Sequence, residues 1–303
     1  GIRINSASEV LCQNNSISSI KTLSDSTKYA INLYGIHKSG SGNIHLSHNL
    51  VGSETVSNSL HCSSTCTASN QILNGIHVNG TGNITVTDNI VSHLSNASNT
   101  SGTYVGRTHG IYITGGTGNS SEVLRNTVKN LSISSGNDNF DTNLSLGGIV
   151  LAGIGTQRTV SYNTVFNLTQ NSTGATIAAA IFFEGSKTVR NYVERNFIYN
   201  ITASGGSAHA GGIGHNLGTT VYAHNIVYLN NSGSARMIGF ADYGNSGSNS
   251  ELYFNTIHIA GTSTAQSFAF FAYTLGNNKI LKNNIFSNTR GNGVHFAFYS
   301  QVD

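Results

Sequence analysis

The acidic side chains of this sequence are few, and they limit the chemistry that it could perform. The 303 residues contain only 12 Asp and Glu together. Hydrolysis of a glycosidic bond ordinarily needs two carboxyl groups a few ångströms apart, and only Asp138 and Asp141 share one short segment, GNDNFDTN. Their oxygen-rich surroundings would suit a calcium ion, although an ordinary polar turn explains the same residues. The sequence therefore indicates no catalytic residue, and calcium is the only candidate cofactor.

Two weaker sets of polar residues recur at equivalent positions of a repeat described below. Asp88 and Arg125 form one set, for which a solvated outer position is a simpler explanation than catalysis. His37 and His77 form the other, with Tyr112 next in the series. Two imidazoles that approach each other could hold a metal ion, but a ladder of solvated rings explains them equally.

Aromatic residues near the C-terminal end suggest binding. We expect Phe240, Phe270 and Phe296 to share one inner column, and a tyrosine follows each of them three residues later. These are Tyr243, Tyr273 and Tyr299. Exposed tyrosine stacks can bind sugar rings or a partner, although stacking also stabilises a sheet without any ligand. The three tyrosines are our candidate ligand-binding residues.

The three cysteines point to an oxidising compartment. Cys12 falls in an apolar column of the repeat, so we expect a buried thiol there. Cys62 and Cys66 lie in a long connection and remain free to pair. A disulfide between them would fit an extracytoplasmic setting. The alternative, a metal site that includes His61, has too few ligands in one place to be favoured.

Asparagine recurs throughout the chain in one local context. Each occurrence has an apolar residue two positions later, and most have an apolar residue three positions earlier. A small residue followed by an apolar one precedes each unit, as in Gly75-Ile76 and Gly110-Ile111, and His295-Phe296 begins a tenth. The asparagines are Asn15, Asn49, Asn89, Asn126, Asn163, Asn196, Asn225, Asn255 and Asn284. Repeats of this kind predict a stacked architecture.

Each unit carries strands that are too short to bury a face alone, so the units must stack. Stacking at one strand spacing, about 4.8 Å, aligns equivalent positions into columns. Asparagine tolerates the left-handed backbone region of a turn, and its amide can bond the amide of the next unit in a ladder. The longer insertions, 52–74, 92–109, 134–147, 170–179 and 202–211, should crowd one side of the rod. Any binding site should lie beside them.

The asparagine turn and segments such as GIHVNGTGNITVTDNIV and NNKILKNNIFSN resemble the right-handed parallel β-helix repeat of pectate-lyase-like proteins and of secreted bacterial surface proteins. The resemblance implies an all-β, right-handed, single-stranded parallel β-helix of about nine coils. We expect residues 1–303 to form one such domain within a longer protein. The fold hosts lyases, hydrolases and non-catalytic adhesins alike, so it does not fix the function.

Composition narrows the functional classes further. Only 9% of the residues are charged, without a basic run, so nucleic acid is not an expected partner. No apolar stretch is close to the length of about 20 residues that a membrane-spanning helix needs. We predict a secreted or cell-surface scaffold, either an adhesin or a fibre or filament subunit. Glycans, other surface proteins, flanking domains or end-to-end copies of the chain would be its partners. The alternative is a polysaccharide lyase or glycoside hydrolase.

Overall fold

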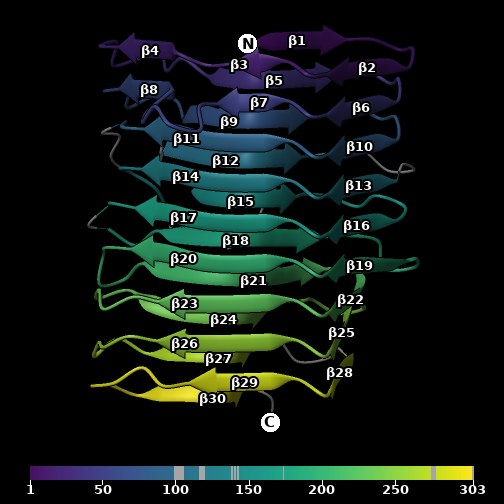
Figure 1. Ribbon diagram of the computed structural model, residues 1–303. Helices are drawn as coiled ribbons and strands as arrows, with labels where there is room; N and C mark the ends of the chain where they lie inside the picture. The colour runs from purple at the N-terminus through teal and green to yellow at the C-terminus, as the bar shows by residue number, and fades with distance from the viewer. Residues whose placement is uncertain are drawn as a thin grey trace.

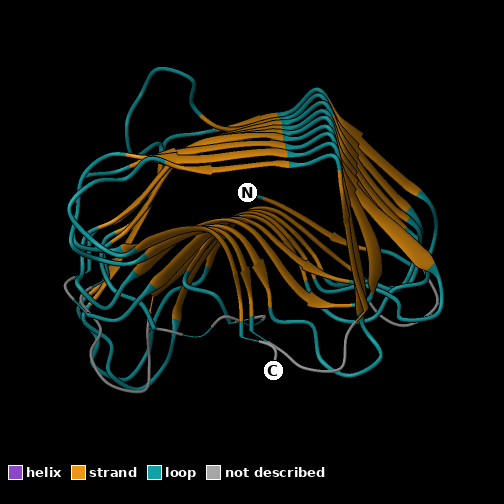
Figure 2. Ribbon diagram, turned by 90° about the horizontal axis from the view of Figure 1, so that it is seen from below, coloured by secondary structure: helices purple, strands orange, loops and turns teal. Residues whose placement is uncertain are grey.

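Short parallel strands wind through three sheets in the computed structural model, which describes residues 1–98, 106–115, 120–137, 139, 141, 143–172, 174–273 and 278–301. The chain passes from sheet A to sheet B to sheet C and back to sheet A, one level further along the axis (Figure 1). Sheet A runs to the right in that view, and sheet C runs to the left in front of it. Seen from below, the turns therefore advance as a right-handed solenoid (Figure 2). The described residues contain no helix long and apolar enough to cross a membrane.

Each sheet repeats one strand of every coil. Sheet A contains β1 (Ile2–Asn5), β5 (Leu33–Ser39), β9 (Gln71–Val78), β12 (Gly106–Ile113), β15 (Leu146–Leu151), β18 (Ile177–Glu184), β21 (His209–Leu217), β24 (Arg236–Asp242), β27 (Ser267–Ala272) and β30 (His295–Ser300). Sheet B contains β2 (Val10–Gln13), β6 (Ile44–Ser47), β10 (Ile84–Thr87), β13 (Ser121–Leu124), β16 (Arg158–Ser161), β19 (Arg190–Glu194), β22 (Thr219–Ala223), β25 (Asn249–Tyr253) and β28 (Asn278–Lys282). Sheet C contains β3 (Ser16–Ile17), β7 (Leu50–Gly52), β11 (Ile90–Asn96), β14 (Thr127–Ile133), β17 (Thr164–Gln170), β20 (Phe197–Ala203), β23 (Ile226–Asn230), β26 (Thr256–Ala260) and β29 (Ile285–Asn288), with β4 (Ile20–Ser24) and β8 (Leu60–Ser64) extending its first coils.

The interior is built from the columns that the repeat predicts. Val91, Val128 and Val165 pair in register on adjacent strands of sheet C, and all three are fully buried. Opposite them, a small residue is required in sheet A because the two sheets approach closely. A Cβ added to Gly110 would lie 2.4 Å from Cγ1 of Val128. This contact explains why glycine or alanine precedes the apolar residue in each coil.

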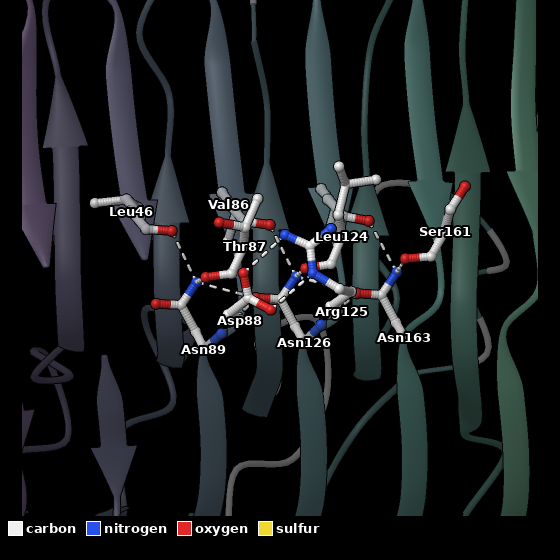
Figure 3. Close-up of polar contacts among 11 residues, drawn as sticks. Leu46, Val86, Thr87, Asp88, Asn89, Leu124, Arg125, Asn126, Ser161 and Asn163 are labelled. Carbon is white, nitrogen blue, oxygen red and sulfur yellow. Dashed lines mark hydrogen bonds and ion pairs between the residues drawn. The ribbon is translucent and has the colours of Figure 1, made fainter. Parts of the chain in front are cut away.

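A ladder of asparagines closes the corner between sheets B and C, as predicted. The Asn89 side chain donates from Nδ2 to Oδ1 of Asn126, 2.9 Å away, and the Asn89 backbone N–H donates to the same oxygen at 3.0 Å (Figure 3). Nδ2 of Asn89 also donates to the main-chain carbonyls of Leu46 and Thr87. The same pattern joins Asn15, Asn49, Asn89, Asn126, Asn163, Asn196, Asn225, Asn255 and Asn284.

The left-handed residue of this corner is not the asparagine, contrary to the expectation. Positive φ angles occur one position earlier, at residues as varied as Asp88, Arg125 and Phe254. Residues such as Arg125 and Phe254 disfavour this backbone region, at a cost of about 1–2 kcal/mol. We infer that the hydrogen bonds of the ladder stabilise the left-handed conformation at this corner, and that the side chain before each asparagine points outward.

The cysteine prediction is half confirmed and half wrong. Cys12 lies in register with Leu46 in the inner column of sheet B, as expected. Cys62 and Cys66 do not form the predicted disulfide, and both thiols are free and buried. Cys62 points into the core from β8 and belongs to its apolar cluster, whereas Sγ of Cys66 lies 3.2 Å from Oγ of Ser69 beyond the strand. Burial raises the pKa of the Cys62 thiol to about 12, so it is unreactive near neutral pH.

Candidate functional site

The most promising binding site is a cleft on the outer face of sheet A, in its last coils. A hollow of about 220 Å³ is lined by Arg236, Gln266, Phe268, Phe271, Tyr273, Phe296, Tyr299 and Gln301. We call it the aromatic cleft. Strands β24, β27 and β30 supply its floor, and Gln266 comes from the loop between sheets C and A.

Two columns of rings form the floor of the aromatic cleft. Phe268 stacks on Phe296 with 5.4 Å between ring centroids and an interplanar angle of 3°. Phe271 stacks on Tyr299 at 5.5 Å and 6°. Both pairs are direct partners across β27 and β30. Phe268 and Phe271 both belong to the apolar cluster at the cleft, whereas Ala269 and Phe270 between them belong to the inner core. Strict alternation would place residues three apart on opposite faces, so strand β27 departs from it here.

The polar groups of the cleft lie at its rim. The Arg236 guanidinium carbon lies 5.8 Å from the ring centroid of Phe268, and Nη2 donates to Oε1 of Gln266 at 3.0 Å. Tyr273 is 52% exposed. Aromatic walls combined with amide and guanidinium donors can bind a ring that carries hydroxyl groups.

The three predicted tyrosines do not form one stack. Tyr243 and Tyr273 are neighbours, with ring centroids 5.7 Å apart and planes inclined by 42°. Tyr299 instead pairs in register with Phe271. The cause is the assignment of the tenth coil, which was wrong. Phe298, not Phe296, pairs with Phe270, so Ala297-Phe298 is the true small-apolar start.

The histidine series runs along the outer face of sheet A in its early coils. His37, His77 and Tyr112 pair in register, and their centroids are 5.0 and 5.1 Å apart. Burial lowers the pKa of His77 to about 4, as it does for the neighbouring His109. Beside them, both amide atoms of the buried Asn74 have no hydrogen-bond partner. The rings are thus stacked and half-buried on the outer face of the sheet.

The carboxylates do not gather at the described hollows. None of the four hollows of about 220 to 350 Å³ is lined by Asp or Glu. Asp88 accepts two hydrogen bonds of 2.8 Å from the Arg125 guanidinium across one coil step (Figure 3), and this pairing lowers the pKa of Asp88. Glu184 is buried and accepts hydrogen bonds from the Gly153 backbone N–H and from Nδ2 of Asn216.

The calcium candidate is described only in part. Asp138 lies outside the described residues, and the Asp141 carboxylate accepts a 2.6 Å hydrogen bond from the backbone N–H of Asn143. Among the residues that the structure describes, no group of three or more His, Cys, Asp or Glu could hold a metal ion.

A second polar ladder, which was not predicted from the sequence, lies on the outside of sheet C. Asn200 donates to Asn167, Asn167 to Asn130, and Asn130 to Nε2 of His93. All four residues have positive φ angles near 55°. They recur four positions after the inner asparagines, a spacing that could have revealed them.

Together the three sheets, the inner ladder and the coil-start columns define a parallel β-solenoid. No family model, curated protein or solved structure matches the chain. The fold is therefore assigned from the in-register pairing of parallel strands in the three sheets.

Proposed function

We propose that this chain is a non-catalytic extracellular scaffold, a surface adhesin or fibre subunit that binds glycans in the aromatic cleft. The observation that supports this proposal best is the composition of the cleft, in which stacked rings meet Arg236, Gln266 and Gln301. Aromatic surfaces bury the C–H faces of a sugar ring, while planar amides and guanidinium groups bond its hydroxyl groups.

Several features of the solenoid fit a scaffold. Its coils stack through main-chain hydrogen bonds and a buried ladder, so a binding face is held rigidly on a long support. The low content of charged residues and the abundance of small polar ones suit a surface protein. The free cysteines offer no argument for secretion, so the extracellular assignment rests on composition and on the resemblance to surface solenoids.

Tyr273→Ala tests the proposal directly. We would screen the protein against a glycan array and measure the best ligand by calorimetry. Removal of the exposed Tyr273 ring should weaken binding about tenfold, because the ring contributes the apolar area that it buries and about 0.5–1.5 kcal/mol of stacking beyond it. Tyr162→Ala is the matched control, since Tyr162 is 55% exposed at the corner between sheets B and C.

Two results would contradict the proposal. Equal losses in both variants would place the glycan outside the aromatic cleft, and a protein that binds no glycan on the array would remove the proposed ligand class. Incubation with acidic polysaccharides and calcium addresses the enzymatic alternative. Steady release of unsaturated products would show a lyase and overturn the non-catalytic assignment.

A further inference from the structure

Five buried polar atoms without a hydrogen-bond partner gather on the outer face of sheet A, in coils that precede those of the aromatic cleft. Within the described part of the chain, nothing bonds either amide atom of Asn74, Nδ1 of His77, Nδ1 of His109 or Nε of Arg107. Asn74 and His109 are direct partners on β9 and β12 (Figure 1), and each is 1% exposed. Buried polar groups normally have a partner, because an unpaired one costs free energy. The cluster therefore calls for a bound species that supplies the missing partners.

The surroundings of His109 leave one of its nitrogens as a bare lone pair. Nε2 lies 2.8 Å from the main-chain carbonyl oxygen of Leu144. A carbonyl oxygen can only accept, so the proton of the neutral ring sits on Nε2, and Nδ1 is unprotonated. A metal-binding histidine usually donates its other N–H to a carbonyl or carboxylate, which fixes the ring and its tautomer. His109 thus has the hydrogen bonding of a metal ligand.

His77 supplies a second imidazole nitrogen. Among the residues that the structure describes, none bonds Nδ1 of His77, so the ring proton is free to sit on Nε2 and leave Nδ1 able to bind. Burial lowers the pKa of His77 and of His109 to about 4, and the neutral imidazole is the form that binds metals. His77 is half-buried, so the cluster can be reached from solvent at this ring.

The inclination of the rings decides which histidines can bind one ion. The lone pair of an imidazole nitrogen lies in the plane of its ring, and so does an ion bound to it. His37 and His77 stack with planes inclined by only 13° and centroids 5.0 Å apart, so their planes do not meet near the rings. Tyr112 is inclined by 20° to His77 and by 43° to His109, so these two imidazoles are inclined by at least 23°, the difference between those angles. The planes of His77 and His109 therefore intersect, whereas the pair His37 and His77 cannot share an ion.

We propose that Asn74, His77 and His109 bind one divalent transition-metal ion, through Oδ1 of the amide and Nδ1 of each imidazole. Two imidazole nitrogens and one neutral oxygen suit copper, nickel or zinc, whereas magnesium and calcium prefer sites built from oxygen alone. Copper(II) should bind most tightly of the three, because affinity for such ligands rises along the series to copper and falls again at zinc. Water would complete the coordination on the side of His77.

The charges beside the site oppose each other. Burial lowers the pKa of His109 most, and the Arg107 guanidinium lowers it further, so this cation lies close enough to act on a bound ion. Burial also lowers the pKa of Arg107, whereas the Asp141 carboxylate raises it. The opposite signs of Arg107 and Asp141 limit their net effect on a metal ion. All three ligands are neutral and offset only part of the cost of removing the ion from water, so we expect moderate affinity.

Titration calorimetry of the whole chain with Cu²⁺, Ni²⁺, Zn²⁺ and Mg²⁺ tests the site. One equivalent of Cu²⁺ should bind, more tightly than Ni²⁺ or Zn²⁺, and Mg²⁺ should not compete with it. Asn74→Leu and His77→Phe should each weaken Cu²⁺ binding at least about tenfold, since even the loss of a group that only orients a ligand costs about 10–100-fold. His48→Asn is the matched control. It removes an exposed imidazole at a left-handed position that asparagine tolerates, so it should leave the affinity unchanged.

Two calorimetric results would overturn the proposal. The first is the lack of any stoichiometric Cu²⁺ binding, which would leave internal water as the species that satisfies the cluster. The second is equal affinity in His77→Phe and in the unaltered protein, which would place the ion at surface histidines. Thermal unfolding followed by circular dichroism establishes that each variant is folded before its affinity is compared.

Electron paramagnetic resonance of the copper complex identifies the ligands even if a variant fails to fold. The spectrum of the unaltered protein should show coupling to two imidazole nitrogens, as should that of His48→Asn. His77→Phe should retain coupling to one imidazole only. Coupling to fewer than two imidazoles in the unaltered protein, or to two in His77→Phe, would contradict the assigned ligands.

Discussion

Two asparagine ladders run along the solenoid, one buried and one on the outside. Their comparison shows how burial changes the number of hydrogen bonds that an asparagine side chain makes. The inner ladder contains Asn126, which is 1% exposed and whose Nδ2 donates to the carbonyls of Val86 and Leu124 as well as to Asn163. The outer ladder contains Asn167, which is half-buried and whose Nδ2 donates to Asn130 alone. In both ladders, side-chain amides one coil apart donate to one another.

The two ladders also use asparagine for different reasons. In the outer ladder the asparagine itself adopts the left-handed conformation, which it tolerates better than most residues. In the inner ladder its neighbour does so, and the asparagine is needed for its amide. We therefore expect the inner positions to reject every substitution and the outer ones to accept many. Four substitutions measure this contrast, from the largest expected effect to the smallest.

Asn126→Asp should be the most damaging change. The new carboxylate oxygen would face the carbonyls of Val86, Leu124 and Asn163, so burial and repulsion would raise its pKa in the folded state. A raised carboxyl pKa means that stability is present at low pH and is lost as the pH rises through that pKa. We expect a loss of about 3–5 kcal/mol at pH 7 and a smaller one at pH 4, measured by chemical denaturation. Asn167→Asp should show little dependence on pH. Equal losses at both pH values would contradict the argument.

Asn126→Ala removes the same amide without adding charge. The backbone N–H of Asn89 and the carbonyl of Val86 would then lose buried partners, at about 1–3 kcal/mol each. We expect a total loss of roughly 2–4 kcal/mol, against less than about 1 kcal/mol for Asn167→Ala. The midpoints of urea unfolding report both. Similar shifts of the urea midpoint in the two variants would mean that burial does not determine how much each ladder contributes to stability.

The sequence predicted the inner ladder because its asparagines have a fixed apolar context, and that context is itself a consequence of stacking. It also placed the apolar residues two positions after these asparagines, such as Val91, Val128 and Val165, on adjacent strands correctly. The spacing of apolar residues did not predict the start of the last coil, because two phenylalanines were possible there. Phe296 and Phe298 are two residues apart on β30, and only the small residue at Ala297 marks Phe298 as the partner of the core residue Phe270.

Contacts that depend on three-dimensional closeness could not be predicted. The disulfide expectation used loop position alone, whereas strand β8 turns Cys62 into the core. The aromatic cleft was found in part, through Tyr273 and Tyr299, but Arg236 and Gln266 meet these rings only because a strand and a loop converge. The outer ladder was missed because it is shorter than the inner one and one of its four members is His93 instead of an asparagine.

Burial also determines what a histidine contributes to stability. The pKa of His77 is lowered to about 4 by burial, with smaller contributions from His37 and His109. The unfolded chain binds that proton near pH 6.5, so stability should fall as the pH drops from about 6.5 to about 4, by up to about 1.4 kcal/mol per pH unit for this group. His77→Phe keeps a ring in the stack and should reduce the slope by one proton. Tyr112→Phe keeps the next ring of the stack and removes no group that titrates between pH 4 and pH 6.5, so it should leave the slope unchanged. An unaltered slope in His77→Phe would contradict this account.

The smallest effect is expected at the ion pair beside the inner ladder. Asp88 and Arg125 directly precede Asn89 and Asn126, but their side chains are 27% and 55% exposed. An exposed ion pair typically contributes about 0.2–1 kcal/mol, and salt screens it. Asp88→Asn should therefore cost less than 1 kcal/mol in dilute buffer and almost nothing in 1 M salt. Because the lowered pKa of Asp88 makes its contribution vanish as the pH falls through that pKa, the variant and the unaltered protein should converge in acid. A loss as large as that of Asn126→Ala would show that the corner depends on charge and not on the buried amides one residue away.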